Sequence, residues 1–219
     1  MAYILIPTAH DEPPIYYSIF NETFNLPKAI LYSTTTERDF VNRRFKNDYI
    51  ESDIVGLGVD INENAQDIDL EKVFGIKDDF VVYVGRIDES KGCKEMFEYF
   101  LEYKKIYNSN LKLVLAGKSA MEIPKNKDIV TLGFVSEDEK VNLIRKSKLL
   151  ILPSKFESLS LSTLEAMYLK VPVLLNGKCE VLKQHAILSN GGLYYENKWE
   201  FIETLDYLIR NSKIAEKMG

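Results

Sequence analysis

The sequence predicts an α/β fold built on a doubly wound parallel sheet. Short apolar runs alternate with stretches of helical periodicity from residue 80 to the end of the chain. Two of these runs, residues 80 to 84 and 149 to 152, are almost entirely apolar, which is typical of strands buried on both faces. Strands that alternate with helices favour parallel pairing through helical crossovers.

The bulk composition limits the class of protein. The 219 residues are 46% apolar, enough for one large or two modest domains, and the formal net charge is −5. This charge disfavours nucleic acid as a partner, because phosphate neutralisation needs clustered Lys and Arg. With no long apolar run and no secretion signal, we expect a cytoplasmic protein. Cys93 and Cys179 are too few for a disulfide framework, and with two His no metal site is expected.

In the first quarter of the chain the expected elements are short. Two strands are expected at residues 3 to 6 and 29 to 33. Residues 54 to 60 are expected to be a third strand that passes into a Gly-containing connection. Two helices are expected, at residues 15 to 24 and 36 to 45. The first strand should be buried and should end at Pro7, and the prolines at 13 and 14 break any continuation. Residues 34 to 36 offer N-caps, and the polar residues 61 to 72 suit a surface linker.

From residue 80 the expected elements follow a regular order. Five buried strands are expected, at residues 80 to 84, 111 to 116, 129 to 132, 149 to 152 and 171 to 175. Helices are expected at residues 93 to 107, 136 to 146, from about 160, and 199 to 209. Ser136 and Glu139 form a capping box at the start of one of them.

Two carboxylates stand eight positions apart where a buried strand passes through a polar loop into a helix. Ligands of open parallel sheets bind outside the carboxyl ends of the strands, where this loop falls. Glu157 at the strand end could meet a reacting group, and Glu165 could hold hydroxyls of a neighbouring part of the ligand. Two other interpretations stay open. Glu157 could be a solvated loop carboxylate, and Glu165 could close a capping box begun by Ser162.

A second motif follows the strand at residues 80 to 84, in the order Gly85, Arg86, Lys91 and Gly92. Arg86 can fork two donors onto phosphate oxygens, and Lys91 adds a compact charge. The helix that opens next offers free backbone N–H groups to an anion. An isolated Arg and Lys would be solvated surface cations, but their place after a buried strand and between glycines favours phosphate binding.

These two motifs, with Leu132-Gly133-Phe134-Val135 between them, resemble in type, spacing and order the signature of retaining nucleotide-sugar glycosyltransferases of the GT-B type, family 4. The resemblance implies that residues 56–219 are the Rossmann-like C-terminal half, which binds the nucleotide sugar. Residues 1–55 would be a remnant of the acceptor-side N-terminal half. Since a complete member has a full acceptor domain there, the chain is expected to be a fragment of such an enzyme.

The resemblance also assigns roles to residues. Gly85, Arg86 and Lys91 would bind the diphosphate, Glu157 a hydroxyl of the donor sugar, and Glu165 two ribose hydroxyls. A turn would hold the base, although it could equally be an ordinary strand-to-helix turn; its residues are Gly133, Phe134 and Val135.

The run after Glu157 departs from the family pattern, in which many members have a Gly-containing turn. Backbone N–H groups of this run would still reach the diphosphate and sugar; its residues are Ser158, Leu159, Ser160 and Leu161. His10 follows an apolar run and precedes Asp11, as in a family pair that faces the donor sugar across the cleft. A structural role for His10 stays open.

The implied function is transfer of a hexose with retention from a UDP-, GDP- or ADP-linked sugar to a saccharide or lipid-linked acceptor. The product class would be a cell-surface polysaccharide or glycolipid, with possible peripheral contact at the inner face of the membrane. No metal or cofactor is implied, because Arg86 and Lys91 take the part of a divalent ion. The alternative is a non-catalytic nucleotide-binding or interaction module from a truncated transferase.

Overall fold

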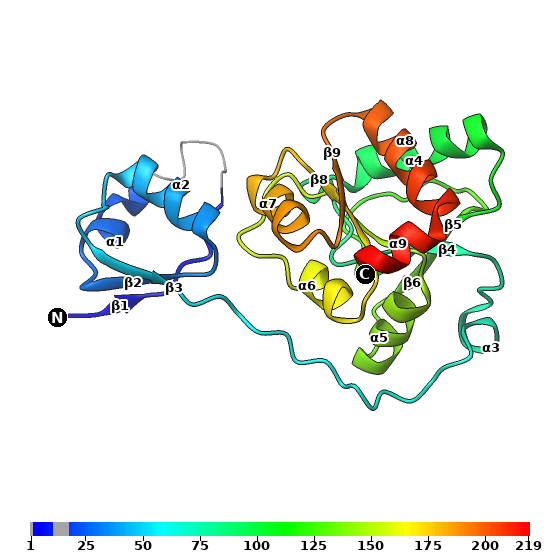
Figure 1. The fold of residues 1–219 in the computed structure, drawn as a ribbon, viewed down its shortest axis with the longest axis horizontal. Helices are drawn as coiled ribbons and strands as arrows, with labels where there is room; N and C mark the ends of the chain where they lie inside the picture. Colours follow the sequence, from blue (N-terminus) through cyan, green and yellow to red (C-terminus); the bar gives the residue numbers. More distant parts are fainter. Residues whose placement is uncertain (1, 11–17) are drawn as a thin grey trace.

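The computed structural model describes residues 2–10 and 18–219. Its strands form two parallel sheets, in the orders β1-β2-β3 and β6-β5-β4-β7-β8-β9, each with a hydrophobic core of its own (Figure 1). The α/β fold with parallel sheets that the sequence predicts is therefore confirmed. Within the described ranges, no helix has the length and apolar character needed to cross a membrane.

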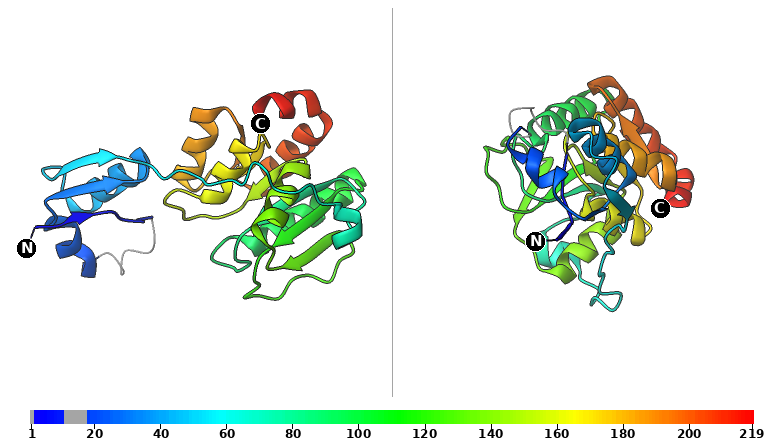
Figure 2. Two further views of the ribbon diagram at one scale, coloured as in Figure 1. Left: turned by 90° about the horizontal axis from the view of Figure 1, so that it is seen from below. Right: turned by 90° about the vertical axis from the view of Figure 1, so that its left-hand side faces the viewer.

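The larger unit is built on six strands in the described part of the chain. They are β4 (Phe80–Val84), β5 (Lys112–Ala116), β6 (Ile129–Gly133), β7 (Leu150–Leu152), β8 (Val173–Asn176) and β9 (Gly192–Tyr195). The helices of this unit are α3 (Leu70–Phe74), α4 (Cys93–Tyr107), α5 (Glu137–Lys146), α6 (Leu161–Tyr168), α7 (Glu180–Ser189), α8 (Lys198–Arg210) and α9 (Ser212–Met218). Helices α4 and α8 pack together on one face of the sheet, and α5 and α6 lie on the other (Figures 1 and 2).

The winding of the larger sheet reverses between β4 and β7. The chain first adds β5 and β6 on one side of β4, then adds β7, β8 and β9 on the other, with all neighbours parallel. Val82 of β4 stands opposite Leu150 of β7 at this junction. Ligands of such sheets bind in the crevice outside the carboxyl ends of the strands at the reversal. The loops after β4 and β7 are therefore where a ligand site is expected.

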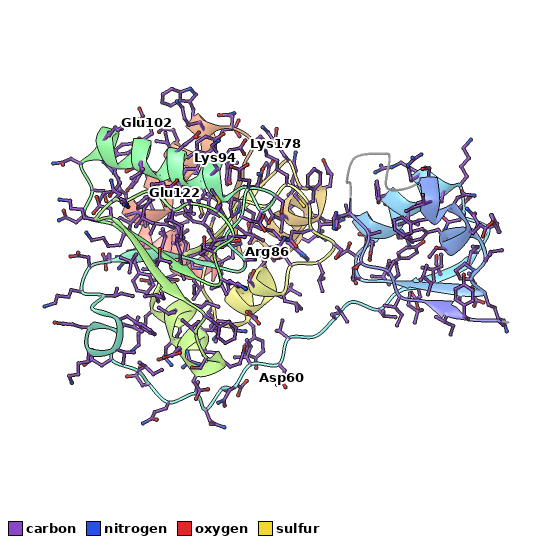
Figure 3. All side chains as sticks on the ribbon, turned by 180° about the vertical axis from the view of Figure 1, so that it is seen from behind. Asp60, Arg86, Lys94, Glu102, Glu122 and Lys178 are labelled. Atoms are coloured by element: carbon purple, nitrogen blue, oxygen red, sulfur yellow. The ribbon has the colours of Figure 1, made fainter. Side chains whose placement is uncertain are left out.

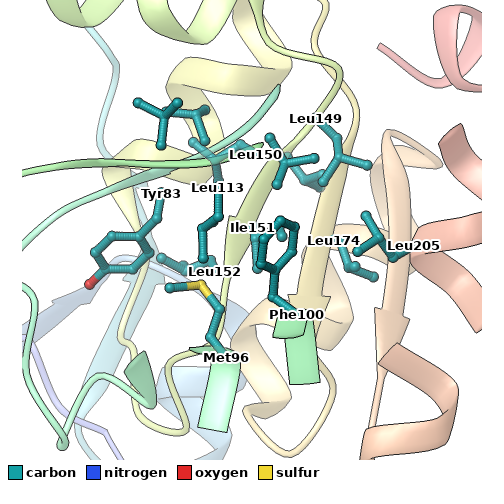
Figure 4. Close-up of a cluster of buried hydrophobic side chains, with 14 of the residues drawn as sticks. Tyr83, Met96, Phe100, Leu113, Leu149, Leu150, Ile151, Leu152, Leu174 and Leu205 are labelled. Atoms are coloured by element: carbon teal, nitrogen blue, oxygen red, sulfur yellow. The ribbon is translucent and has the colours of Figure 1, made fainter. Parts of the chain in front are cut away.

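The core of the larger unit explains why its strands read as apolar runs. Figure 4 shows side chains of α4, such as Met96 and Phe100, packed among Leu113, Ile151 and other residues of the sheet. These side chains are fully buried, because helices cover both faces. Burying each one stabilises the fold by about 1.5–3 kcal/mol.

The smaller unit is a three-stranded sheet packed against short helices. Its strands are β1 (Ile4–Leu5), β2 (Ala29–Tyr32) and β3 (Glu51–Ile54). Its helical segments are η2 (Ser18–Phe20), α1 (Asn21–Asn25) and α2 (Thr35–Phe45). Ile30 and Tyr32 are buried among Phe24, Val41 and Phe45.

Two strand predictions in this unit are wrong in part. The strand at β1 is present but not buried, since Ile4 and Ile6 are 60% and 62% exposed. Ile4 stands in register with Ala29 and Glu51, on a face of the sheet that is only partly covered. The strand expected to begin at residue 54 instead ends there, since β3 lies at 51–54. The Gly-containing connection expected after it is present over residues 55 to 60, with Gly56 at φ +62°.

The remaining expectations divide between confirmed and missed elements. Helix α4 and the capping box of α5 lie as predicted, and Thr34 caps α2. The helix expected at residues 15 to 24 is a 3-10 turn followed by α1, while residues 15 to 17 and the break at 11 to 14 lie outside the described residues. The expected linker at 61 to 72 overlaps α3, which Asp69 caps. Helices α7 and α9 and strand β9 were not predicted.

Candidate functional site

Two glycines bring the loops after β4 and β5 together. Gly85 and Gly117 have φ of +148° and +147°. A Cβ atom on Gly117 would lie 1.9 Å from the carbonyl oxygen of Gly85, so only glycine fits there. The N–H of Gly85 donates to Ala116 O at 3.0 Å, and the N–H of Gly117 donates to Gly133 O at 2.7 Å. These bonds join the loops after three neighbouring strands at the carboxyl edge of the sheet.

Side-chain hydrogen bonds of Tyr83 and Asp88 fix the loop that carries Arg86. The buried phenol of Tyr83 donates to the carbonyl oxygen of Arg86 at 2.6 Å, and its burial raises the pKa of Tyr83. Asp88 accepts from Ser90 Oγ at 2.6 Å and from the Lys91 N–H at 3.0 Å, and it forms an ion pair with Arg86. Burial would raise the pKa of Asp88, but these bonds outweigh it and hold the pKa below its usual range.

Arg86 itself remains accessible. Its side chain is 63% exposed, and Figure 3 shows it on the side of the larger unit that faces the smaller sheet. A guanidinium on a fixed backbone, exposed beside the winding reversal, is arranged to meet an anion.

Lys91 and Glu157 join the two motifs directly. Lys91 Nζ lies 2.7 Å from Glu157 Oε1, and the two side chains are 32% and 16% exposed. Gly92, at φ +73°, caps α4 so close to β7 that a Cβ atom there would lie 2.3 Å from Pro153 O. The loop that carries Arg86 and Lys91 therefore packs against the loop that carries Glu157. Glu157 is not a solvated carboxylate.

Glu165 is paired with a cation from a neighbouring helix. Lys140 Nζ lies 2.9 Å from Glu165 Oε1, and both side chains are mostly buried. Burial would lower the pKa of Lys140, but its bonds to Glu137 and Glu165 outweigh that effect and raise the pKa. Helix α6 begins at Leu161 after Ser160, so the interpretation of Glu165 as part of a capping box begun by Ser162 is wrong.

The loop between Glu157 and α6 is fixed by a left-handed residue and by a bond from α7. Ser160 has φ +70°, a conformation that favours glycine, and its hydroxyl lies 2.9 Å from Thr163 Oγ1. His185 Nε2 lies 2.6 Å from the carbonyl oxygen of Leu159. Burial lowers the pKa of His185, and the Leu159 carbonyl offsets this in part. His185 thus fixes the loop that contains Ser158, Leu159, Ser160 and Leu161. This contact was not predicted from the sequence.

The turn after β6 leaves an aromatic ring at the surface. Gly133 has φ +71°, and Phe134 is 90% exposed. Val135 packs against the core, and Ser136 then opens the capping box of α5. The turn is therefore a strand-to-helix cap that also presents Phe134 outward.

His10 reaches the same region from the smaller unit. A pocket between the two units is lined by Ala9 and His10 on one side and by Phe156 and Glu157 on the other. The rings of His10 and Phe156 are stacked, with centroids 6.3 Å apart. The structure thus brings His10 beside the Glu157 loop. Its sequence neighbour Asp11 lies outside the described residues.

Among the predicted site side chains, Lys91 and Glu157 contact each other, whereas Arg86 pairs with Asp88 and Glu165 with Lys140. Sequence reasoning missed the residues that hold the site, which are Tyr83, Asp88, Lys140 and His185. The hydroxyl of Tyr83 in an otherwise apolar strand was one available signal. In residues 2–10 and 18–219, no group of three or more His, Cys, Asp or Glu side chains is placed to hold a metal ion.

The sequence is similar to glycosyltransferases. The sequence model of the family described as Glycosyl transferases group 1 matches residues 66–219. The uncharacterized glycosyltransferase MJ1607 of Methanocaldococcus jannaschii is 29% identical over 141 residues, which are 57% of this chain and 35% of that protein. The alpha-D-kanosaminyltransferase of Streptomyces kanamyceticus is 29% identical over 125 residues, 52% of this chain and 32% of that protein. The chain thus spans about a third of the length of these two curated relatives.

Solved structures share the fold over nearly the whole chain. Sucrose-phosphate synthase of Thermosynechococcus elongatus matches 95% of this chain and 55% of its own, with a TM-score of 0.75 and 14% identity. Alr3699/HepE of Anabaena, in complex with UDP and glucose, matches 94% of this chain and 60% of its own, with a TM-score of 0.74 and 14% identity. These likenesses show the Rossmann-like α/β fold of GT-B glycosyltransferases. Since the family match also covers well over half of the sequence, the chain belongs to the glycosyl transferases group 1 family.

Proposed function

We propose that this chain is the donor-binding part of a retaining glycosyltransferase that transfers a hexose from a nucleotide-diphosphate sugar to a saccharide or lipid-linked acceptor. The contact between Lys91 and Glu157, at the reversal of the sheet, carries the proposal. It joins a loop suited to a diphosphate to a carboxylate suited to a sugar. HepE of Anabaena, which shares the fold, was solved with UDP and glucose, in keeping with such a donor.

The diphosphate would lie on the loop after β4 and at the start of α6. Arg86 is exposed and forms an ion pair with Asp88. Lys91, on the same loop, adds a second positive charge. No side-chain hydrogen bond caps the start of α6, which leaves backbone N–H groups for phosphate oxygens. Fixed cations and dipoles stabilise the negative charge that develops on a leaving diphosphate. This arrangement supplies the charge that a divalent ion would otherwise provide.

The nucleoside and the sugar of the donor would lie on either side of the diphosphate. Glu165, held by Lys140, would accept from the ribose hydroxyls, while Gly133, Phe134 and Val135 would hold the base. Glu157 would accept from a hydroxyl of the transferred sugar. The N–H groups of the run Ser158, Leu159, Ser160 and Leu161 would contact the sugar and the diphosphate.

The transfer would occur at the pocket between the two units. The bond from the anomeric carbon to the diphosphate oxygen breaks, and the acceptor hydroxyl oxygen bonds to the same face of that carbon. The hydroxyl proton passes to the departing phosphate oxygen. His10 would contact the sugar from the opposite side, across from Glu157. The product would keep the anomeric configuration of the donor. Its class would be a cell-surface polysaccharide or glycolipid.

The test is transfer followed by proton NMR. The chain is incubated with UDP-, GDP- and ADP-linked hexoses and simple saccharide acceptors, with Arg86→Ala as the control. Release of one nucleoside diphosphate together with a glycoside of unchanged anomeric configuration is expected. A product of inverted configuration would refute the retaining course, and release that is equally fast with Arg86→Ala would refute the phosphate assignment.

One observation favours a second candidate. Ile4 on β1 and Ile6 just after this strand leave apolar side chains 60% and 62% exposed, which suits a face that is completed by further polypeptide. The chain would then be a non-catalytic module that binds the nucleotide and an additional polypeptide. Both candidates predict nucleotide binding, so sugar transfer by the chain discriminates between them.

A further inference from the structure

Glu37, in the first turn of α2, is a buried carboxylate without a part in the mechanism above. It is only 1% exposed, and carboxylates are rarely so buried unless their oxygens are bonded. Burial raises the pKa of Glu37, and backbone N–H bonds from Ser33, Ala9 and Thr34 offset this in part.

The two oxygens of Glu37 tie two loops to one helix. The N–H of Ala9 donates to Oε1 at 2.6 Å, and the N–H of Ser33 donates to Oε2 at 2.8 Å. Ala9 directly precedes His10, so one of these bonds fixes the backbone a single residue before the His10 ring. The other fixes the end of β2.

The same turn of α2 rests on the larger unit. Thr34 Oγ1 accepts from the Glu37 N–H at 3.0 Å and lies 3.4 Å from the carbonyl oxygen of Ser158. The hydroxyls of Thr35 and Thr36 donate to Gln184 Oε1 on α7. The start of α2 is thus in contact with the loop after Glu157, and through Glu37 it also holds the His10 loop.

From these contacts we infer that Glu37 is a positioning residue that sets His10 against the Phe156–Glu157 side of the pocket. A carboxylate is required because two N–H donors must be met by two acceptor oxygens. The substitution Glu37→Gln places an NH₂ group against one of these two N–H donors, so it should release one of the two loops. The role of His10 toward a donor sugar rests on the proposed function; the holding of its loop does not.

The direct test is NMR of the full chain with Glu37→Gln and a matched control, Glu22→Gln. Glu22 is an exposed glutamate of the same unit. The chain has two His, so His185→Gln assigns the two ring signals. We expect the His10 ring signal and the Ala9 amide signal to move in Glu37→Gln and to stay in Glu22→Gln. Unchanged His10 and Ala9 signals in Glu37→Gln would overturn the inference.

A kinetic measurement separates positioning from simple stabilisation. Misplacing a catalytic group by about 1 Å can cost about a hundredfold in rate. We therefore expect kcat per folded molecule to fall about tenfold to a hundredfold in Glu37→Gln, with the donor KM unchanged and partial rescue in Glu37→Asp. An unchanged kcat per folded molecule would show that Glu37 only supports the fold and would overturn the inference.

The two proposals fail in distinguishable ways. A wild-type chain that releases no diphosphate would count against the proposed function, while the NMR comparison would still decide the holding of the His10 loop. If Glu37→Gln does not fold, hydrogen exchange of the wild-type chain decides instead. The Ala9 amide should then exchange slowly although it lies outside a strand, and exchange as fast as an exposed loop amide would overturn the inference.

Discussion

Replacing Gly92 by alanine tests whether the loop that carries Arg86 and Lys91 packs on the loop that carries Glu157. Gly92 has φ +73°, and a Cβ atom there would lie 2.3 Å from Pro153 O. That carbonyl cannot move freely, because it also accepts from the buried Asn176 Nδ2 at 2.8 Å. Gly75 is the matched control, since it has φ +71° with nothing within 4 Å of an added Cβ.

The magnitude follows from the difference between the two sites. Both substitutions place a Cβ in the left-handed region, which costs about 1–2 kcal/mol. Only Gly92→Ala adds a contact with a packed backbone, and overpacking typically costs a further 1–3 kcal/mol or so. For a unit of this size, about 1 kcal/mol shifts the melting temperature by roughly 2–4 °C. Gly92→Ala should therefore melt at least about 2 °C below Gly75→Ala.

The assay is thermal unfolding followed by circular dichroism, with nucleoside diphosphate binding measured in parallel. Both glycines belong to the larger unit, so the same transition reports on both. We expect Gly92→Ala to lose both stability and binding, and Gly75→Ala to lose some stability only. Equal melting temperatures for the two variants would refute the packing of the Arg86–Gly92 loop against β7.

Three further predictions concern residues that hold the site. Tyr83→Phe removes the donor to the Arg86 carbonyl, so unfolding in urea should become easier by about 1–3 kcal/mol, whereas an unchanged midpoint would show that the bond contributes nothing. The pKa of His185 is lowered in the folded chain, so its contribution to stability is present above the ordinary pKa and is lost as the pH falls. Urea midpoints at about pH 5 and about pH 8 should show this loss, and His185→Gln should reduce it. Glu165→Gln should weaken nucleotide binding about tenfold, whereas Glu137→Gln, at the exposed partner of Lys140, should not; equal effects in a titration would contradict the ribose assignment.

Elements with strong local signals could be predicted from the sequence. Helix α4 and the capping box of α5 lie where they were predicted, because helical periodicity and capping depend only on residues that are close in sequence. Strands β4 and β7 were evident as apolar runs, since helices cover both faces of the larger sheet. In the smaller sheet the same reasoning overestimated burial at Ile4, because covering helices cannot be read from the strand itself.

Partners far apart in sequence explain the rest. The sequence predicted that Arg86, Lys91 and Glu157 lie in loops after strands. It could not predict the contact of Lys91 with Glu157, because 66 positions separate these two residues. The bond of His185 to Leu159 and the two bonds of Glu37 are likewise products of packing. Helix α7 was missed because no side chain caps its start at Cys179, and strand β9 was missed because it is not a fully buried apolar run, since its Leu193 and Tyr194 are not buried.

Calorimetric titration with UDP, GDP and ADP in the presence of EDTA decides whether the chain holds a metal-independent diphosphate site. We expect one of the three to bind without a metal ion, and we expect Arg86→Ala to weaken its affinity by about tenfold or more. Binding of none of them, or equal affinity of the wild-type chain and Arg86→Ala, would contradict a diphosphate site on the loop after β4.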